Sequence, residues 1–310
     1  MNYRNICTLM LMAGLFTLGS CSDDNELSSV SVFENVSEKQ KSEFDEWLEN
    51  NYRKTYNIDF KYRYSDKESD LSFNVIPADF DKSKGLAILV KHMWLDVYKE
   101  AVGEDFVRTY VPRIIQLTGS YKWNANGSQV LGTAEGGLKV MLYGVNDLDL
   151  DNARVNTANP YESHYVRPLD MNYWFFHTMH HEFCHILTQK IEYDPSFRSI
   201  SAASYHATDW VNLEDKNVAK EGFVSAYGSG EYNEDFAEIY ATYITLSADG
   251  WQKIIDAAGN EGSAILNQKL DILKDYFKNS WGFELDDLRA IIMQHSATVP
   301  QLDLRTLPTE

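Results

Sequence analysis

The sequence predicts an α+β fold with a small mixed β-sheet and helices in its first part, then one long buried helix, then a helical C-terminal part. Three observations support this prediction. Segments in which apolar and polar residues alternate, as they do in strands, lie only in the first half of the chain. A long apolar segment covers residues 169–191, and helical patterns separated by glycines fill the chain after residue 233. Strands first and helices later is the element order of α+β proteins.

The N-terminal part should alternate helices and strands. Ser37 and Gln40 have the spacing of a capping box and predict a helix to about Tyr52, with Phe44, Trp47 and Leu48 facing inward. Residues 78–102 are mostly helical in pattern. Strands are expected at 58–64, 112–123 and 138–145, and the segment GTAEGG at 132–137 is expected to be a turn between strands.

Two long polar loops and a set of helices make up the remainder. Residues 147–168 and 193–233 lack a clear periodicity, so we expect loops there. Helices are expected at about 234–248, 251–258, 263–279 and 284–296, punctuated by Gly250, Gly259 and Gly282.

The apolar segment 169–191 has the pattern of a buried helix. Asp170, which follows Pro168, is suited to cap its N-terminus. One apolar stripe faces the core, formed by Phe176, Met179, Phe183 and Leu187. At about 100° per residue, His181 and His185 project away from this stripe. These two histidines therefore require a role other than core packing.

Residues 181–185 read His-Glu-Phe-Cys-His, a HExxH pattern. One helical turn separates His181 from His185, so both imidazoles can bind one Zn²⁺ ion at about 2.0–2.1 Å. Glu182 lies next to the first ligand, and its carboxylate can reach a water on the metal without binding the metal. This arrangement is the core of a zinc-dependent hydrolase, in which zinc lowers the pKa of its water and Glu182 accepts the proton.

A catalytic zinc site needs a third protein ligand. The segment YGSGEYNEDFAE, residues 227–238, leads into an apolar run that predicts a helix, and Glu234 and Glu238 share a face of that helix. We assign Glu234 as the third ligand and Glu238 as the acceptor that orients a ligand histidine. Asp235 and Glu231 remain alternative ligands. In the plainer interpretation, these carboxylates lie in solvent at the start of the helix and interact favourably with the positive end of its dipole.

Other residues near the motif have simpler interpretations. His177 and His180 would be ligands only in a shifted register, because only His181 and His185 bracket a glutamate. We expect His177 to lie in the core or behind the ligands. Cys184 is expected to be a small buried hydrophobic residue.

The HEFCH helix followed by AYGSGEYNEDFAE resembles the zincin metallopeptidases of the lethal-factor type. The resemblance covers two helices and the loop between them, and Cys184 stands where those enzymes have glycine. It implies a peptidase, with Glu234 as the third ligand and Tyr227 donating a hydrogen bond to the oxyanion; His206 is a competing donor. It also implies a cleft bordered by an edge strand of the sheet, for which residues 138–145 are our candidate.

The front of the chain predicts export and a lipid anchor. Residues 1–20 hold one charge, Arg4, and an apolar run, as in a signal peptide. Leu18-Gly19-Ser20-Cys21 fits a lipoprotein cleavage site with the lipid on Cys21, and Ser22-Asp23-Asp24 resembles the signal for the outer cell surface. Polar residues 21–36 would form a flexible membrane tether. The catalytic domain would then be 37–310, with a sheet-bearing part (37–168) and a helical part (169–310).

The net charge and the cysteine content limit the kinds of partner and bond that we expect. The net charge is −18, which becomes −19 when residues 1–20 and their Arg4 are removed. Such a charge repels nucleic acid and anionic lipid, so we expect no nucleic acid partner and membrane contact only through Cys21. Three cysteines are present. Cys7 leaves with the signal and Cys21 carries lipid, so no intrachain disulfide is expected.

The whole chain, lipid anchor included, is similar to the Bacteroidetes family called substrate import-associated zinc metallohydrolase lipoproteins. That resemblance implies an outer-membrane location near a TonB-dependent transporter and its surface lipoprotein, with a peptide or protein as substrate. Two alternatives stay open. The chain could be a non-catalytic binding lipoprotein on a zincin fold, or a zinc hydrolase of another amide. The presence of Glu182 argues against a pure binding protein.

Overall fold

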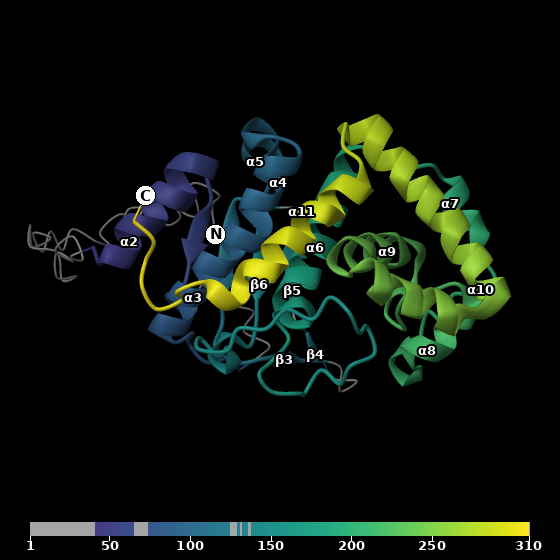
Figure 1. Ribbon diagram of the computed structural model, residues 1–310, viewed down its shortest axis with the longest axis horizontal. Coiled ribbons are helices and arrows are strands. Elements are labelled where there is room, and N and C mark those ends of the chain that lie inside the picture. Colours follow the sequence, from purple (N-terminus) through teal and green to yellow (C-terminus); the bar gives the residue numbers. More distant parts are fainter. Residues whose placement is uncertain (1–40, 65–73, 125–128, 131, 136–137, 310) are drawn as a thin grey trace, which may run out of the picture. The chain divides into compact units, whose positions relative to one another are not determined.

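Within the part of the chain that the structure describes, strands lie in the first half and long helices dominate the second, in the order that the sequence predicts (Figure 1). The structure is a computed structural model that describes residues 41–64, 74–124, 129–130, 132–135 and 138–309. The predicted signal peptide, the predicted lipid site Cys21, the predicted tether and the predicted capping box of Ser37 and Gln40 lie outside these residues. Among the described residues, no helix combines the length and apolar character needed to cross a membrane.

The first helices form one side of the core. Helix α2 (Glu43–Leu48) continues as the π-helical turn η1 (Glu49–Lys54), and its Phe44, Trp47 and Leu48 are buried, as predicted. The predicted helical region 78–102 consists of α3 (Phe80–Val90), η3 (Lys91–Leu95) and α4 (Asp96–Ala101). Helix α5 (Glu104–Tyr110) follows after Gly103 and was not predicted.

The main sheet has four strands in the order β1-β2-β6-β5. Strands β1 (Asp59–Lys61), β2 (Ile114–Leu117) and β6 (Lys139–Leu142) are parallel, with Phe60 opposite Ile115 and Ile115 opposite Val140. Strand β5 (Gly132–Glu135) pairs with β6 in the antiparallel direction, so the sheet is mixed. Strands β3 (Lys122–Trp123) and β4 (Gln129–Val130) form a separate hairpin.

Two predictions about this sheet were wrong. Residues 132–135, expected to belong to a turn, form β5, and residues 136–137 lie outside the described part. The strand within 138–145 was our candidate for the edge, but β6 is an inner strand, and β5 lies at the edge beside it. In β5 only Thr133 is of a type that favours strands, whereas Gly132, Ala134 and Glu135 are of types that are depleted in them. Hydrogen bonding to β6 therefore fixes the strand conformation of this segment.

The long apolar segment forms η5 (Asn172–Phe176) and α6 (His177–Lys190). Asp170 accepts hydrogen bonds from the backbone N–H groups of Asn172 (3.0 Å) and Tyr173 (3.4 Å), which is the predicted cap. The stripe of Phe176, Met179, Phe183 and Leu187 is fully buried. The opposite face of α6 is thereby left for the site.

The C-terminal part is helical, as predicted. Helix α9 (Tyr232–Thr245) packs against α6, and α11 (Leu285–Thr298) packs against α4 and α9. Helix α10 (Ala248–Tyr276) is divided at Gly259, whose φ of 65° is left-handed and favours glycine. The loop 193–233 contains two short helices that were not predicted, α7 (Ser196–Ile200) and α8 (Asp215–Val218).

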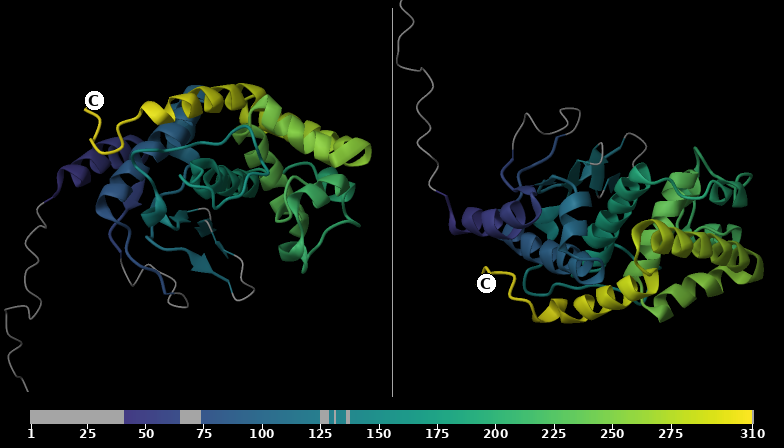
Figure 2. Two further views of the ribbon diagram at one scale, coloured as in Figure 1. Left: turned by 60° about the horizontal axis from the view of Figure 1, so that its bottom comes forward. Right: turned by 90° about the horizontal axis from the view of Figure 1, so that it is seen from above.

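Helices α6 and α9 lie between two groups of elements. The sheet and α2–α5 lie on one side, and α7, α8 and α10 lie on the other (Figures 1 and 2). Buried side chains from both groups belong to one hydrophobic core that surrounds α6. The helix that carries the HExxH pattern is therefore held rigidly by its core face.

Candidate metal centre and active-site cleft

Three side-chain atoms from α6 and α9 converge on one point. Nε2 of His181 lies 3.0 Å from Nε2 of His185. Oε2 of Glu234 lies 3.0 Å from Nε2 of His181 and 3.3 Å from Nε2 of His185. The helical period places the two histidines on one face of α6, and the packing of α9 on α6 brings Glu234 to them.

The geometry and chemistry of this group suit a zinc ion. Bonds of about 2.0–2.1 Å in a tetrahedron put neighbouring ligand atoms about 3.3 Å apart, close to the three distances found here. Two imidazoles and one carboxylate are also a common ligand set of catalytic zinc. The ligand atoms of His181, His185 and Glu234 all lie within 4.8 Å of one another, which is close enough for them to hold one metal ion. The predicted ligand set therefore fits the metal, although the ligand roles themselves stay a prediction.

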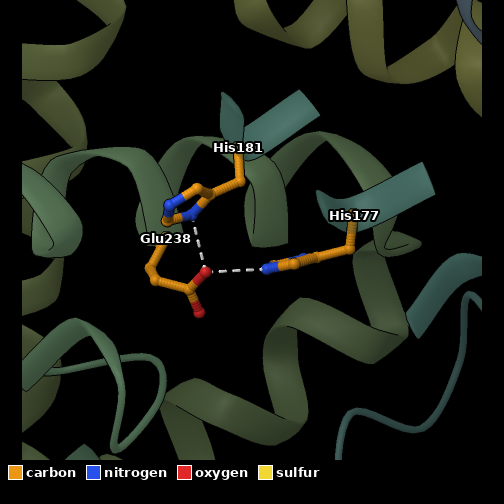
Figure 3. A group of neighbouring side chains, drawn as sticks. All are labelled: His177, His181 and Glu238. Atoms are coloured by element: carbon orange, nitrogen blue, oxygen red, sulfur yellow. Dashed lines mark hydrogen bonds and ion pairs between the residues drawn. The ribbon is translucent and has the colours of Figure 1, made fainter. Parts of the chain in front are cut away.

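Glu238 lies behind this centre and contacts two histidines (Figure 3). Its Oε1 is 2.8 Å from Nδ1 of His181 and 2.9 Å from Nε2 of His177. Its Oε2 accepts a hydrogen bond of 2.6 Å from the hydroxyl of Ser225. A carboxylate at Nδ1 holds the proton there and leaves the lone pair of Nε2 for a metal. This position is the one that the predicted orienting role of Glu238 requires.

The electrostatics of the centre favour a cation. Burial would lower the pKa of His181, but hydrogen bonds to Glu234 and Glu238 outweigh it and raise the pKa to about 10. Burial would raise the pKa of Glu234, but the hydrogen bonds and charges of His181 and His185 hold it below its ordinary value. Without a metal, the two carboxylates thus attract a proton to the place where a metal would supply positive charge.

Tyr227 lies at the rim of the centre and is 42% exposed. Its ring lies 5.8 Å from that of His181 and 5.0 Å from that of Trp210. Burial of the hydroxyl, followed by the charge of Glu234, raises its pKa above the ordinary value, so the hydroxyl keeps its proton. The competing donor His206 instead contacts Glu221 at 2.9 Å and is not among the residues that line the cleft described below.

The alternative ligands point elsewhere. Asp235 is fully buried on another face of α9, where its Oδ2 lies 2.6 Å from Nζ of Lys269. It also accepts a hydrogen bond of 2.9 Å from Tyr205. Glu231 caps α9 by accepting the backbone N–H of Glu234. Both carboxylates are thus engaged in holding the helix, and Glu234 is the carboxylate that faces the two histidines.

The remaining residues near the motif have structural positions. His180 is fully buried, with Nδ1 2.9 Å from the hydroxyl of Tyr98, and burial lowers its pKa to about 3. Cys184 is a buried free thiol, as expected. His177 lies behind the centre on Glu238, one of the two positions that the sequence allowed for it.

A cleft of about 1100 Å³ lies over the side of α6 that carries His181 and His185. Its lining includes His181, Glu182, His185, Glu234 and Tyr227, together with Gly132 and Thr133 of the edge strand β5. A carbonyl group placed here can reach the three converging atoms, the Glu182 carboxylate and the Tyr227 hydroxyl. The arrangement is suited to hydrolysis assisted by a metal.

The sequence did not reveal the residues that hold the turn carrying Tyr227. Asp215 accepts a hydrogen bond of 2.7 Å from the backbone N–H of Ala226. The hydroxyl of Ser225 accepts a hydrogen bond of 3.0 Å from the backbone N–H of Gly228. Ser225 thereby connects this turn to Glu238. Serine and aspartate are ordinary in a polar loop, so no local pattern distinguishes these two.

Similarity to known proteins agrees with this geometry. Residues 37–286 match the family described as "Putative zinc-binding metallo-peptidase". A crystal structure of a putative zinc-binding metallo-peptidase from Bacteroides caccae ATCC 43185 is 42% identical, with a TM-score of 0.70, and the match covers 87% of this chain and 97% of that chain. No curated protein matches the chain significantly.

Proposed function

Because the chain belongs to the family of putative zinc-binding metallo-peptidases, we propose that it hydrolyses peptide bonds in the cleft over α6, with Glu182 as general base. One observation carries the proposal. Nε2 of His181, Nε2 of His185 and Oε2 of Glu234 meet within 3.0–3.3 Å at the base of a cleft that Glu182 also lines. A protein that only bound peptides would need neither this convergence nor a glutamate beside it.

The chain's own groups divide the work of hydrolysis. Zinc, when bound by His181, His185 and Glu234, would polarise the substrate carbonyl and acidify water. Glu182 accepts a proton from the attacking water and passes it to the leaving amine. The protonated hydroxyl of Tyr227 donates a hydrogen bond to the oxygen that becomes negative. Glu238 holds the imidazole of His181 in the orientation that a ligand needs.

The setting of this activity is part of the same proposal. We propose a lipid on Cys21 that anchors the enzyme to the outer membrane at the cell surface, joined by the tether 21–36. The substrate would be a peptide or protein handled near a TonB-dependent transporter and its surface lipoprotein. This part rests on the sequence pattern at residues 18–24 and on the resemblance described above. Loss of radiolabelled lipid from a Cys21→Ala variant would support the anchor.

The test of function joins metal content with cleavage. We expect elemental analysis of the purified protein to find about one zinc per chain and the His185→Ala variant to lose it. The wild type should cleave members of a peptide library, and Glu182→Gln should retain zinc but lose cleavage. Cys184→Ser, a change on the core side of the same helix, is the control that should keep zinc.

Each alternative function predicts a different result. A folded wild type that takes up no added zinc would favour a binding lipoprotein. Zinc binding with cleavage of other amides but no peptides would favour a different hydrolase. Full activity of Glu182→Gln would remove the assigned general base.

A further inference from the structure

The cleft is chemically different at its two ends. Helix α6 forms its base, and the lining extends from Tyr173, just before α6, to Gln189 and Glu192 at its C-terminal end. From Tyr173 to Gln189, at about 1.5 Å per residue, this length is roughly 24 Å, which accommodates about seven residues of an extended peptide at 3.3 Å each. The metal centre lies between the ends, so a bound peptide would contact both.

The end near Tyr173 is aromatic. The ring of His164 stacks on that of Tyr173 with centroids 3.4 Å apart, and the ring of Tyr165 lies 6.3 Å from that of Trp174. Tyr121 also packs on Trp174, at 4.9 Å, and Trp123, two residues further along the chain on β3, lines the cleft. Trp123, His164, Tyr165 and Tyr173 are called the aromatic end below. They come from three segments that line the same cleft, namely β3, the loop before η5, and η5 itself.

Two rings of the aromatic end are open to solvent. Trp123 is 52% exposed and Tyr165 is 69% exposed. Among the described residues the other exposed aromatic side chains are Phe80 and Tyr227, so exposed aromatic surface is concentrated in this cleft. Large exposed apolar side chains gathered at one place on a soluble protein mark a binding site.

The opposite end is polar. Thr188, Gln189, Glu192 and Asn233 line it beyond His185. Over the whole cleft, carboxylates outnumber the two basic residues, Lys122 and Arg198. An apolar substrate side chain would cover the two most exposed rings of the cleft, Trp123 and Tyr165, at the aromatic end.

We propose that the aromatic end binds an aromatic or large aliphatic side chain of the substrate, on one side of the scissile bond. This inference rests on the proposed peptidase function, because it names the class of peptide that the same site takes. The polar end accepts hydrophilic residues on the other side of the bond. The enzyme therefore selects peptides with one bulky apolar residue near the cleaved bond.

The test compares matched peptides. Peptides of one sequence would carry either Phe or Ala at each position flanking the cleaved bond, and kcat/KM would be measured for each. We expect the wild type to favour Phe at one position by about ten- to a hundredfold, the gain from covering one aromatic side chain. Tyr165→Ala and Trp123→Ala should each lower this preference severalfold, measured as the ratio of kcat/KM for the Phe peptide to that for the Ala peptide.

Two controls separate the ring from general effects of substitution. Tyr165→Phe keeps the ring and should keep the preference. Val166→Ala truncates the adjacent side chain, which is 42% exposed and does not line the cleft, and it should also keep the preference. A preference that survives in both Tyr165→Ala and Trp123→Ala would overturn the aromatic subsite and leave the peptidase function standing.

A binding measurement separates failure of the subsite from failure of the function. Glu182→Gln retains the cleft, so fluorescently labelled Phe and Ala peptides can be titrated into it by anisotropy. Tighter binding of Phe peptides, lost on adding Tyr165→Ala, would support the subsite even if the wild type cleaved nothing. Equal binding of Phe and Ala peptides, or no binding, would refute it. Binding of a glycosylated peptide in preference to its bare form would assign the rings to a sugar and also overturn the proposal.

Discussion

Two consecutive histidines on α6 have nearly the same burial and opposite electrostatics. His180 is 0% exposed and His181 is 4% exposed. His180 faces the core, where its Nδ1 lies 2.9 Å from the hydroxyl of Tyr98, and burial lowers its pKa to about 3. His181 faces the cleft between two carboxylates. There burial acts in the same direction, but Glu234 and Glu238 outweigh it and raise the pKa to about 10.

The difference shows that burial alone does not make a metal site. A phenol beside an imidazole satisfies its hydrogen bond without attracting positive charge, whereas two carboxylates attract a cation to the same kind of ring. The core face of α6 therefore holds a neutral histidine, and the cleft face holds a pair of histidines ready for a metal. Substitutions on each face should separate these two roles.

The largest effect is expected from replacing each histidine with glutamine. His181→Gln removes a ligand, so zinc content measured by elemental analysis should fall from about one per chain to nearly none. His180→Gln should keep its zinc and lower the unfolding temperature instead, because the change is in the core. Equal loss of zinc in the two variants would show that the two faces are not distinct.

A second effect should appear in the pH dependence of stability. The unfolded chain takes up a proton on His180 near pH 6.5, while the folded chain resists it until about pH 3. The unfolded state thus binds more protons below pH 6.5, and the free energy of unfolding should fall as the pH drops through this window. At pH 4.5, two units below the ordinary pKa, the loss is about 3 kcal/mol, from roughly 1.4 kcal/mol per pH unit.

His180→Gln is the matched comparison for this pH effect. The variant has no imidazole to protonate at this position, so its stability deficit relative to the wild type should shrink between pH 7 and pH 4.5. Urea unfolding at both pH values measures the two free energies. Deficits of the same size at both pH values would mean that His180 is not the titrating group.

The sequence predicted both faces of α6. The core stripe follows from a period of 3.6 residues, and the histidine pair follows from the same period, because both concern one helix. The chemistry of Glu234 and Glu238 was accessible because they lie four residues apart on a second apolar helix. Local periodicity thus predicted the α+β order, the helix of the site, and the histidines and carboxylates that the structure brings together, whereas Tyr227 followed only from the resemblance to zincin metallopeptidases.

What the sequence did not predict depends on contacts between distant segments. Strand β5 is a strand because residues 132–135 pair with β6, and nothing in Gly132 or Thr133 alone requires it. Ser225 contributes to the site because its hydroxyl donates a hydrogen bond to Glu238, which lies on helix α9. The aromatic end likewise needs three segments to meet. Each of these features lies in a polar or irregular stretch, where sequence patterns are weakest.

The smallest effect should come from the residues behind the metal centre, and it tests whether the cleft face depends on its carboxylates. Glu238→Gln keeps the shape of the side chain but removes the charge that faces His177 and His181. We expect the affinity for zinc, measured by competition with a chelator, to fall about ten- to a hundredfold. Unchanged zinc affinity would mean that Glu238 does not orient the ligand.

A smaller effect on zinc binding is expected from Ser225, which contacts the centre through Glu238. Ser225→Ala removes the hydrogen bond of 2.6 Å to that carboxylate and the bond accepted from the backbone N–H of Gly228, and it should weaken zinc binding by roughly two- to tenfold. Ser296→Ala is the matched control, because this buried serine bonds to the carbonyl of Ile292 on α11 and should leave zinc affinity unchanged. If Ser225→Ala weakened binding as much as Glu238→Gln, the turn carrying Tyr227 would matter more to the centre than the carboxylate itself. A graded series would instead show that the negative charge at Glu238, held in place by Ser225, distinguishes His181 from its neighbour His180.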